Sequence, residues 1–534
     1  MKNKKISFLL LSLSFILSML ITSCDVKNPV DGIELRVKTI ARTNVVSLSI
    51  YNGATQNLIQ PNTVTVTFEG DYADKIISMT NDPLTSATTT SGILNFAVAD
   101  DVIPTPEAPI TITAVVAVDG YISSSVKIFI TSPGASAYGI SLANYSAPPV
   151  GVVSNSTSGA ASSTTGATTT IVANSGVESN TGASATVTIP AGTILKDKNG
   201  TALSGEVKTR VTYFNPKDEQ SLNSFPGGFA VEADGASGSF VTAGFTAIDM
   251  TAGGTKVENF GSSVNVDIDI PADLINPETG NSLAPGDKIP LWSYDEETGL
   301  WTKEGEVTVP SALAKSANGK SVYKVSTKIN HLSYWNLDWF QDACYEGITI
   351  NVTGGCYPYI MLKAKRISDG AYFYSGYIYG NDRAVHLYNA PSAVPVMVEL
   401  WDYSVYPYVK LEEMRVDDLC GTDVDFPITK TNGMVEVNAK ITAICHNSDG
   451  DVTSRFYPNN YSVYVRPSNS YNWSYMGQVI EGEITACFTL GQEYTFGAYI
   501  DGEWLEHTEV ISKTTYELEF SDLDYPDEMD DMCN

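Results

Sequence analysis

The stretch TVTVTF at residues 63–68 alternates threonine with valine or phenylalanine along its whole length. Successive side chains of a β-strand point to opposite faces, so this alternation is typical of a strand with one buried face. The stretch IELRVK at residues 33–38 alternates in the same way, and residues 110–118 and 125–131 flank a hairpin-like turn at 119–121. We therefore predict an all-β chain of several tandem antiparallel β-sandwiches.

The composition agrees with this class. The chain has 534 residues, of which 43% are hydrophobic, enough for sizeable buried cores. Its 61 acidic and 32 basic residues give a formal net charge of −29. That balance excludes nucleic acid as a partner, because binding phosphates requires a basic surface.

The N-terminus carries an export signal. Lys2, Lys4 and Lys5 precede an apolar run over residues 6–20, which is too short to span a membrane. The run ends in ITSC at 21–24, which resembles a bacterial lipobox. The resemblance implies a signal peptide over 1–23, a lipidated Cys24 and a tether over 24–32. A plain signal peptide followed by a coincidental cysteine is the alternative.

The residue after Cys24 bears on location. Asp25 resembles an inner-membrane retention signal of enterobacterial lipoproteins, whereas early acidic residues resemble a surface-export signal in lipoproteins of the Bacteroidetes type. The composition of the rest favours the second, so we expect an anchor in the lipid bilayer of the outer membrane, facing the cell surface.

The middle of the chain divides into three parts. Residues 33–132 resemble a bacterial immunoglobulin-like sandwich. Residues 133–184 are rich in Ser, Thr and Gly and are predicted to be a linker. Residues 185–340 contain VTIPAGT at 187–193, LWSYDEETGLW at 291–301 and NHLSYWN at 330–336. These motifs resemble the extracellular β-domain of cartilage intermediate layer proteins and of a related family of membrane proteins, which implies a non-catalytic scaffold.

The second of these motifs predicts a hairpin. Gly299 is placed for a left-handed bend, and Trp292 and Trp301 fall on the paired strands. The two rings could form an exposed platform for sugars, but packing in the core is the favoured interpretation.

Six cysteines follow residue 343, and none lies between Cys24 and that point. An even set in an exported chain, without a CxxC pair, indicates disulfides rather than zinc. Three lie on each side of a boundary near residue 430, so complete pairing requires at least one bridge across it. We expect Cys445–Cys487 as an internal bridge. The six residues are Cys344, Cys356, Cys420, Cys445, Cys487 and Cys533.

Residues 341–430 and 431–520 show a weak internal duplication, in which each unit resembles a transthyretin-like, carboxypeptidase regulatory-like sandwich. Residues 521–534 form an acidic tail that we expect to be solvated. This C-terminal block is rich in aromatic residues, which are either ordinary strand residues or ligand contacts. The candidate ligand-binding residues are Tyr372, Tyr374, Tyr377, Tyr379, Tyr403, Tyr406, Tyr408, Trp473 and Trp504.

Enzyme motifs are missing from the sequence. There is no HExxH and no GxSxG, and His331 is interpreted as a structural histidine. The acidic stretch at 447–451 begins like a calcium loop but lacks its distal glutamate, so a hairpin turn is predicted. We expect no catalytic residue, no metal site and no cofactor.

Together these features predict a membrane-anchored, non-enzymatic adhesion or structural module with an extracellular protein or glycan ligand. The alternative is a surface glycan-binding lipoprotein of a carbohydrate-uptake system. We expect the N-terminal domains to act as a stalk and the C-terminal block to carry the contact surface away from the membrane.

Overall fold

The computed structural model describes residues 35–38 and 42–523, with gaps at 106–107, 234–235, 343–346, 358–359, 368–371, 379–382, 388–394, 404–407, 421–422, 431, 460, 471–472 and 501–502. The signal peptide and Cys24 therefore lie outside the described residues. Those residues form two compact units, a larger one over 42–440 and 459–516 and a smaller one of 35–38, 441–458 and 517–523. In the described part of the chain, no helix has the length and apolar character needed to cross a membrane.

The fold is nearly all β, as predicted. Within the described residues, helical structure is confined to one 3-10 turn, η1 (Ala73–Lys75), and one short helix, α2 (Glu219–Asn223).

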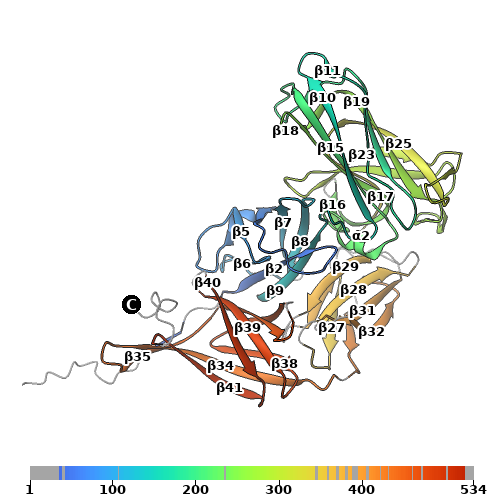
Figure 1. The fold of residues 1–534 in the computed structure, drawn as a ribbon. Coiled ribbons are helices and arrows are strands. Elements are labelled where there is room, and N and C mark those ends of the chain that lie inside the picture. The colour runs from blue at the N-terminus through green and yellow to red at the C-terminus, as the bar shows by residue number, and fades with distance from the viewer. Residues whose placement is uncertain are drawn as a thin grey trace, which may run out of the picture. The chain divides into compact units, whose positions relative to one another are not determined.

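The first sandwich pairs two four-stranded sheets (Figure 1). Residues 64–68 of the alternating stretch lie in β3, whose residues alternate between buried and half-buried as the pattern predicts. Phe68 and Phe96 meet between the sheets with ring centroids 4.7 Å apart. The sheets have the orders β4-β6-β2-β9 and β5-β3-β7-β8, with bounds β2 (Asn44–Asn52), β3 (Val64–Glu69), β4 (Ile76–Ile77), β5 (Ser86–Thr89), β6 (Ile93–Val98), β7 (Ile110–Val118), β8 (Ser124–Ile130) and β9 (Gly134–Leu142).

The prediction of a linker over 133–184 is wrong. Its first residues form β9, which pairs in parallel with β2 along nine residues and completes the first sandwich. Its middle forms β10 (Val152–Ser162), which pairs antiparallel with β15 (Gly205–Phe214) over ten residues. Small and hydroxylated side chains bury little surface, but threonine and valine favour strands when a partner strand supplies the hydrogen bonds.

The central domain runs from β10 to β26, residues 152–342, and contains a nine-stranded, a six-stranded and a two-stranded sheet. In the largest sheet the run β17-β16-β23-β22-β26 closes on itself, because β26 also pairs with β17. Trp335 and Trp339 are buried between the two larger sheets. The remaining elements are β11 (Gly166–Ala167), β12 (Ile171–Asn174), β13 (Ala185–Ile189), β14 (Leu195–Lys196), β16 (Ala230–Ala233), β17 (Ala236–Ala252), β18 (Thr255–Lys256), β19 (Asn259–Pro271), β20 (Ile275–Asn276), β21 (Asn281–Ser282), β22 (Lys288–Tyr294), β23 (Trp301–Thr308), β24 (Ala314–Lys315), β25 (Ser321–His331) and β26 (Tyr334–Asp342).

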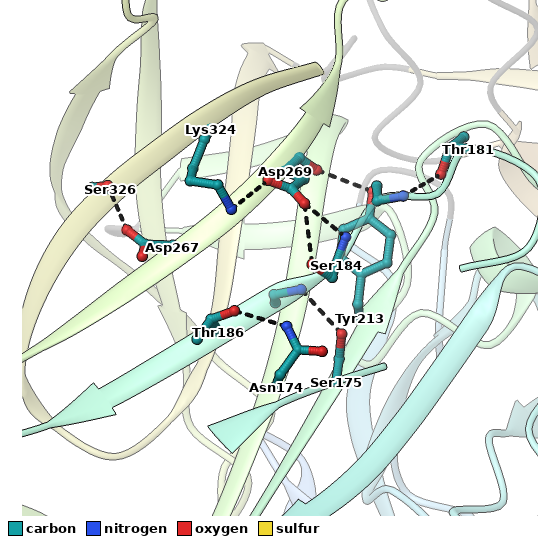
Figure 2. A network of polar contacts seen from close by, with 12 residues as sticks. Asn174, Ser175, Thr181, Ser184, Thr186, Tyr213, Asp267, Asp269, Lys324 and Ser326 are labelled. Atoms are coloured by element: carbon teal, nitrogen blue, oxygen red, sulfur yellow. Dashed lines mark hydrogen bonds and ion pairs between the residues drawn. The ribbon is translucent and has the colours of Figure 1, made fainter. Parts of the chain in front are cut away.

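A polar network holds the end of the supposed linker in place (Figure 2). Ser184 donates to Oδ2 of the buried Asp269 through its backbone N–H and its hydroxyl, each at 3.1 Å. Lys324 Nζ lies 3.0 Å from Asp269 Oδ1, an ion pair without the alignment of a hydrogen bond. Asn174 Nδ2 donates to the hydroxyl of Thr186 at 2.8 Å. The polar side chains of this segment therefore satisfy one another and the backbone, which orders it.

We expect Asp269→Ala to lower the free energy of unfolding by about 2–3 kcal/mol, because it leaves the two Ser184 donors without their acceptor in a buried site. Urea denaturation measures this. Asp267→Ala on the same strand is the matched control, since its partners Ser326 and Asn265 are at a half-buried site and the loss should stay below about 1 kcal/mol. Equal losses for the two variants would contradict the role of Asp269.

The C-terminal third contains two modules with the same order of strand pairing. The first has sheets β30-β27-β33 and β29-β28-β31-β32. In the second, β34 pairs with β38 and β41 as part of a five-stranded sheet that also includes β35 and β1, and the other sheet has the order β37-β36-β39-β40. The internal duplication seen weakly in the sequence is thus present as a repeated strand order. The first module comprises β27 (Ile348–Thr353), β28 (Ile360–Arg366), β29 (Tyr372–Ile378), β30 (Ala384–Leu387), β31 (Val396–Asp402), β32 (Val409–Val416) and β33 (Val424–Pro427). The second comprises β34 (Val435–His446), β36 (Tyr461–Pro467), β37 (Ser474–Val479), β38 (Glu483–Phe488), β39 (Glu493–Ile500), β40 (Glu503–Val510) and β41 (Thr515–Ser521).

The smaller unit contains residues 441–446 of β34, residues 517–521 of β41 and the strand β35 (Val452–Tyr457). Strand β1 (Leu35–Lys38) pairs in parallel with β35. Asp522, placed in the solvated tail from the sequence, instead accepts the backbone N–H of His446 at 2.9 Å and lies 2.6 Å from His446 Nδ1.

One disulfide confirms the parity argument. Cys356 of the first module is bonded to Cys487 of the second. The expected Cys445–Cys487 bridge is therefore wrong, because a cysteine forms only one such bond. Cys420 and Cys445 are also disulfide-bonded, whereas Cys344 and Cys533 lie outside the described residues.

Within the larger unit the sandwiches contact one another, including a pair that is not consecutive in the chain. The hydroxyl of Tyr294 donates to Ser125 of the first sandwich at 2.7 Å. Tyr464 of the last module hydrogen-bonds to Ser47 and Asn95 of the first sandwich, at 2.7 and 3.0 Å. The expectation of an N-terminal stalk below a separate C-terminal block is wrong, because the last module packs on the first sandwich.

Candidate ligand-binding surface

Most of the tyrosine candidates are not shown to be exposed. Tyr372 and Tyr377 belong to β29, but their side chains are not among those that the structure describes. Tyr379 and Tyr406 lie outside the described residues. Tyr374 packs against the hydrophobic core, and burial, with a smaller effect of Tyr138, raises the pKa of its phenol. Tyr374 therefore contributes to packing, and its half-buried side chain offers little surface to a ligand.

Tyr403 and Tyr408 form a second packing element. Their rings stack with centroids 3.8 Å apart and an interplanar angle of 7°. Lys363 lies 5.6 Å from the Tyr403 centroid and bonds to Glu219 of α2 at 2.5 Å. Burial raises the pKa of Tyr403, and the charge of Lys363 opposes this. The stack thus contributes to the contact between the first C-terminal module and the central domain.

Trp473 and Trp504 are half-buried, as are Tyr374, Tyr403 and Tyr408, but they belong to the last module and lie where it meets the first sandwich. Their rings meet edge to face at 5.0 Å. The guanidinium of Arg466 lies 4.8 Å from the Trp473 ring, and Trp504 Nε1 donates to Glu506 at 2.9 Å. These contacts fix both indoles in one orientation, which suits a preformed binding surface.

The first sandwich supplies the other side of this surface. Leu58, Trp473 and Trp504 pack around a small cluster of Ile93, Tyr464 and Tyr475. The buried hydroxyl contacts of Tyr464 keep the last module against the first sandwich. Trp473 consequently lies beside the loop at 52–60.

Hydrogen bonds made by its own side chains hold the loop at 52–60 in one conformation. Asn52 Oδ1 accepts the backbone N–H groups of Ala54 and Thr55 at 2.9 and 3.1 Å, and Asn52 Nδ2 donates to the hydroxyl of Tyr121 at 3.0 Å. Gln56 adopts a left-handed conformation with φ 59° and donates from its side chain to the carbonyl of Gly53 at 2.7 Å. An asparagine that bonds backbone groups two and three residues ahead is the usual means of closing a short turn.

A cleft of about 320 Å³ lies between this loop and Trp473. We call it the Trp473 cleft. Its lining includes Tyr51, Tyr121 and Trp473 as aromatic groups and four side-chain amides, and none of the described residues that line it is charged. The amides belong to Asn52, Gln56, Asn57 and Gln60.

A second cleft of about 350 Å³ flanks the Cys356–Cys487 disulfide. Arg383 at its edge donates to the carbonyls of Gly354 and Gly355 at 2.6 and 2.7 Å. Burial lowers the pKa of this guanidinium. Because Arg383 is engaged with the backbone, we interpret it as a structural brace for the disulfide loop.

The other residues singled out in the sequence have structural roles. Trp292 and Trp301 are 4% and 3% exposed, which confirms core packing over a sugar platform. Gly299 has φ 70° and closes the turn between them, as predicted. His331 lies 3.2 Å from Glu304 and against the Trp335 ring.

The calcium-like stretch forms the predicted hairpin turn. Asn447 Oδ1 accepts the backbone N–H groups of Asp449 and Asp451, each at 2.9 Å. Among the described residues, no group of three or more His, Cys, Asp or Glu side chains is placed to hold a metal ion.

Sequence reasoning named Trp473 and Trp504 but missed the loop at 52–60 and Tyr121. The available signal was a run of neutral amides, TQNLIQ at 55–60, after an Asn-Gly turn. That run is ordinary in a loop, and its significance depends on a tryptophan more than 400 positions away.

No protein-family model matches the chain, and no curated protein matches it. Among solved structures, the Bacillus anthracis TIE protein aligns at 8% identity, covering 86% of this chain and 68% of that one, with a TM-score of 0.14. GBS52, the minor pilin of Streptococcus agalactiae, aligns at 8% identity over 33% of this chain and 94% of that one, with a TM-score of 0.14. A fimbrial protein from Bacteroides ovatus aligns at 10% identity over 33% of this chain and 50% of that one, with a TM-score of 0.11. Similarities at these scores carry no argument, so the class of the protein rests on its own strands: an all-β protein of tandem sandwiches.

Proposed function

We propose that the chain is a lipid-anchored, non-catalytic binding protein of the cell surface, which attaches to an extracellular protein or glycan. The observation that carries the proposal is the pair Trp473 and Trp504, partly exposed and held rigid beside the Trp473 cleft. Partly exposed aromatic residues held by packing are typical of contact surfaces, because they bury a large area at little cost in side-chain entropy.

Two further features support a location outside the cell. The lipobox-like sequence ending at Cys24 supports export and anchoring. The disulfide between the two C-terminal modules supports an oxidising compartment, where such bonds persist.

The anchor leads to a direct prediction. We expect Cys24→Ser to move the protein from the membrane fraction to the soluble fraction, because acyl chains are the proposed hold on the bilayer. Cell fractionation, together with metabolic labelling by a palmitate analogue, measures this. A variant that stays with the membranes, beside a wild-type protein that takes up no label, would contradict lipidation.

The contact surface is tested on cells that display the full-length protein. We expect Trp473→Ala and Trp504→Ala each to reduce attachment to immobilised extracellular matrix and mucin at least tenfold, the equivalent of about 1.4 kcal/mol. Leu490→Ala, an exposed apolar residue of the same module, is the matched control and should attach like wild type. Circular dichroism verifies folding. Unchanged attachment by both tryptophan variants would place the contact surface elsewhere.

A further inference from the structure

We propose that the Trp473 cleft binds a neutral saccharide. This inference rests on the proposed function, since it names the ligand chemistry of the same surface. It adds the first sandwich to the site, because the loop at 52–60 and Tyr121 form one wall of the cleft.

The polar lining matches sugar hydroxyl groups. A side-chain amide both donates and accepts hydrogen bonds, as a pair of adjacent hydroxyls does. In the described part of the chain, the amides of Asn57 and Gln60 and the indole N–H of Trp473 have no hydrogen-bond partner, although all three residues line the cleft. Asn52 and Gln56, in contrast, are used to shape the loop. The free groups are thus presented by a scaffold that is already ordered.

The apolar lining matches the rest of a sugar ring. Tyr121 and Trp473 offer aromatic carbon surface, against which the C–H groups of a pyranose can pack. Trp473 is oriented by Arg466 and Trp504, so no ordering of this side chain is needed on binding.

Charge selects against other ligands. No charged residue lines the cleft within the part of the chain that the structure describes, and the whole chain carries a formal net charge of −29. Arg466, which packs on the Trp473 ring, is already engaged with the carbonyl of Ser470 and with Glu506. Sulfated or sialylated glycans would therefore gain no free cationic partner from it and would be repelled by the acidic protein. The volume of about 320 Å³ lies at the small end of the usual range of about 300–1,000 Å³ for ligand sites, which suits the terminal one or two units of a glycan.

The test is saturation-transfer NMR on the purified full-length chain. The neutral probes are cellotriose, α-mannotriose, β-1,4-galactotriose and chitotriose, and the anionic probes are sialyllactose and a heparin hexasaccharide. We expect at least one neutral probe to receive saturation at millimolar concentration and neither anionic probe to do so. Saturation of no neutral probe, or of the anionic probes alone, would overturn the proposal.

Variants then place the bound sugar. We expect Asn57→Ala and Trp473→Ala each to weaken binding of the responding probe at least fivefold by isothermal titration, while Leu490→Ala leaves it unchanged. Asn57 is exposed on the loop, so its variant folds even if that of Trp473 does not. Unchanged affinity in the Asn57 variant would show that the sugar binds elsewhere and would overturn the site.

The outcome separates this inference from the proposed function. If the wild type binds no saccharide but cells still attach through Trp473 and Trp504, only the inference fails. If a saccharide binds in the cleft but Cys24→Ser does not alter membrane location, only the proposed anchoring fails.

Discussion

Replacing Asp338 by asparagine is expected to make the protein more stable at pH 8 and to change its stability little at pH 4. Asp338 lies on β26 in the central domain, and its side chain is fully buried. Asn336 donates to its Oδ2, but its Oδ1 has no hydrogen-bond partner among the described residues. Burial raises the pKa of this carboxyl to about 8, which Thr242, Asn336 and the nearby Arg366 only partly oppose.

The direction of the effect follows from proton binding. Between the ordinary aspartate pKa of 3.8 and the folded pKa of about 8, the folded chain holds a proton that the unfolded chain releases. Unfolding therefore becomes easier as the pH rises through this window, by up to about 1.4 kcal/mol per pH unit. This contribution to stability is complete below pH 3.8 and is lost by about pH 8. Asparagine has no proton to release, so the stability of the variant does not fall in this window. Its advantage over wild type should therefore grow by about 3–4 kcal/mol between pH 5 and pH 8.

Thermal unfolding of both proteins at several pH values measures the difference. Burial raises the pKa of Glu296 to about 7, so this residue also makes stability fall as the pH rises. Because it does so in both proteins, the difference between them isolates the effect of Asp338. Asp267→Asn, at a half-buried site on β19, is the matched control for the substitution itself. Parallel pH profiles for wild type and Asp338→Asn would contradict a protonated Asp338.

The second large effect concerns the bond between the C-terminal modules. We expect the double variant Cys356→Ala/Cys487→Ala to lose about 2–5 kcal/mol of stability. The bond joins residues 131 positions apart, and without it the unfolded chain regains the freedom of a long loop. Urea denaturation of the oxidised proteins measures the loss.

The same variant tests how the modules are coupled. Limited proteolysis should cut it between the two modules sooner than wild type, because the bond no longer resists their separation. Reduction of wild type is a poorer test, since Cys420 and Cys445 are also in disulfides. If the variant unfolds at the wild-type urea concentration, the bond does not contribute to the coupling.

Several features could be predicted because their cause is local. The alternation in β3 needs only the geometry of one strand, and its burial follows the pattern residue by residue. The turn closed by Gly299 needs only a left-handed residue. The bond between the modules needed only parity, since three cysteines on each side of a boundary cannot all pair internally. The choice of Cys356 for Cys487 was not predictable, because it depends on which strand ends meet.

Other features depended on partners remote in the chain. The supposed linker is ordered because β10 pairs with β15 and Ser184 reaches Asp269, 85 positions away. Tyr403 and Tyr408 looked like a binding cluster from their spacing, but Lys363 connects them to α2. A composition of serine, threonine and glycine, or a run of tyrosines, does not reveal whether a partner will cover it.

The sequence by itself determined the all-β class, the repeated C-terminal architecture and the presence of a bridge between its halves. These follow from periodicity, repetition and counting, which do not depend on how distant segments meet. Only the tertiary structure decided that the last module packs on the first sandwich and that Trp473 shares a cleft with the loop at 52–60. Both outcomes rest on the fit of side chains more than 350 positions apart, such as Tyr464 against Asn95, and no local pattern encodes that fit.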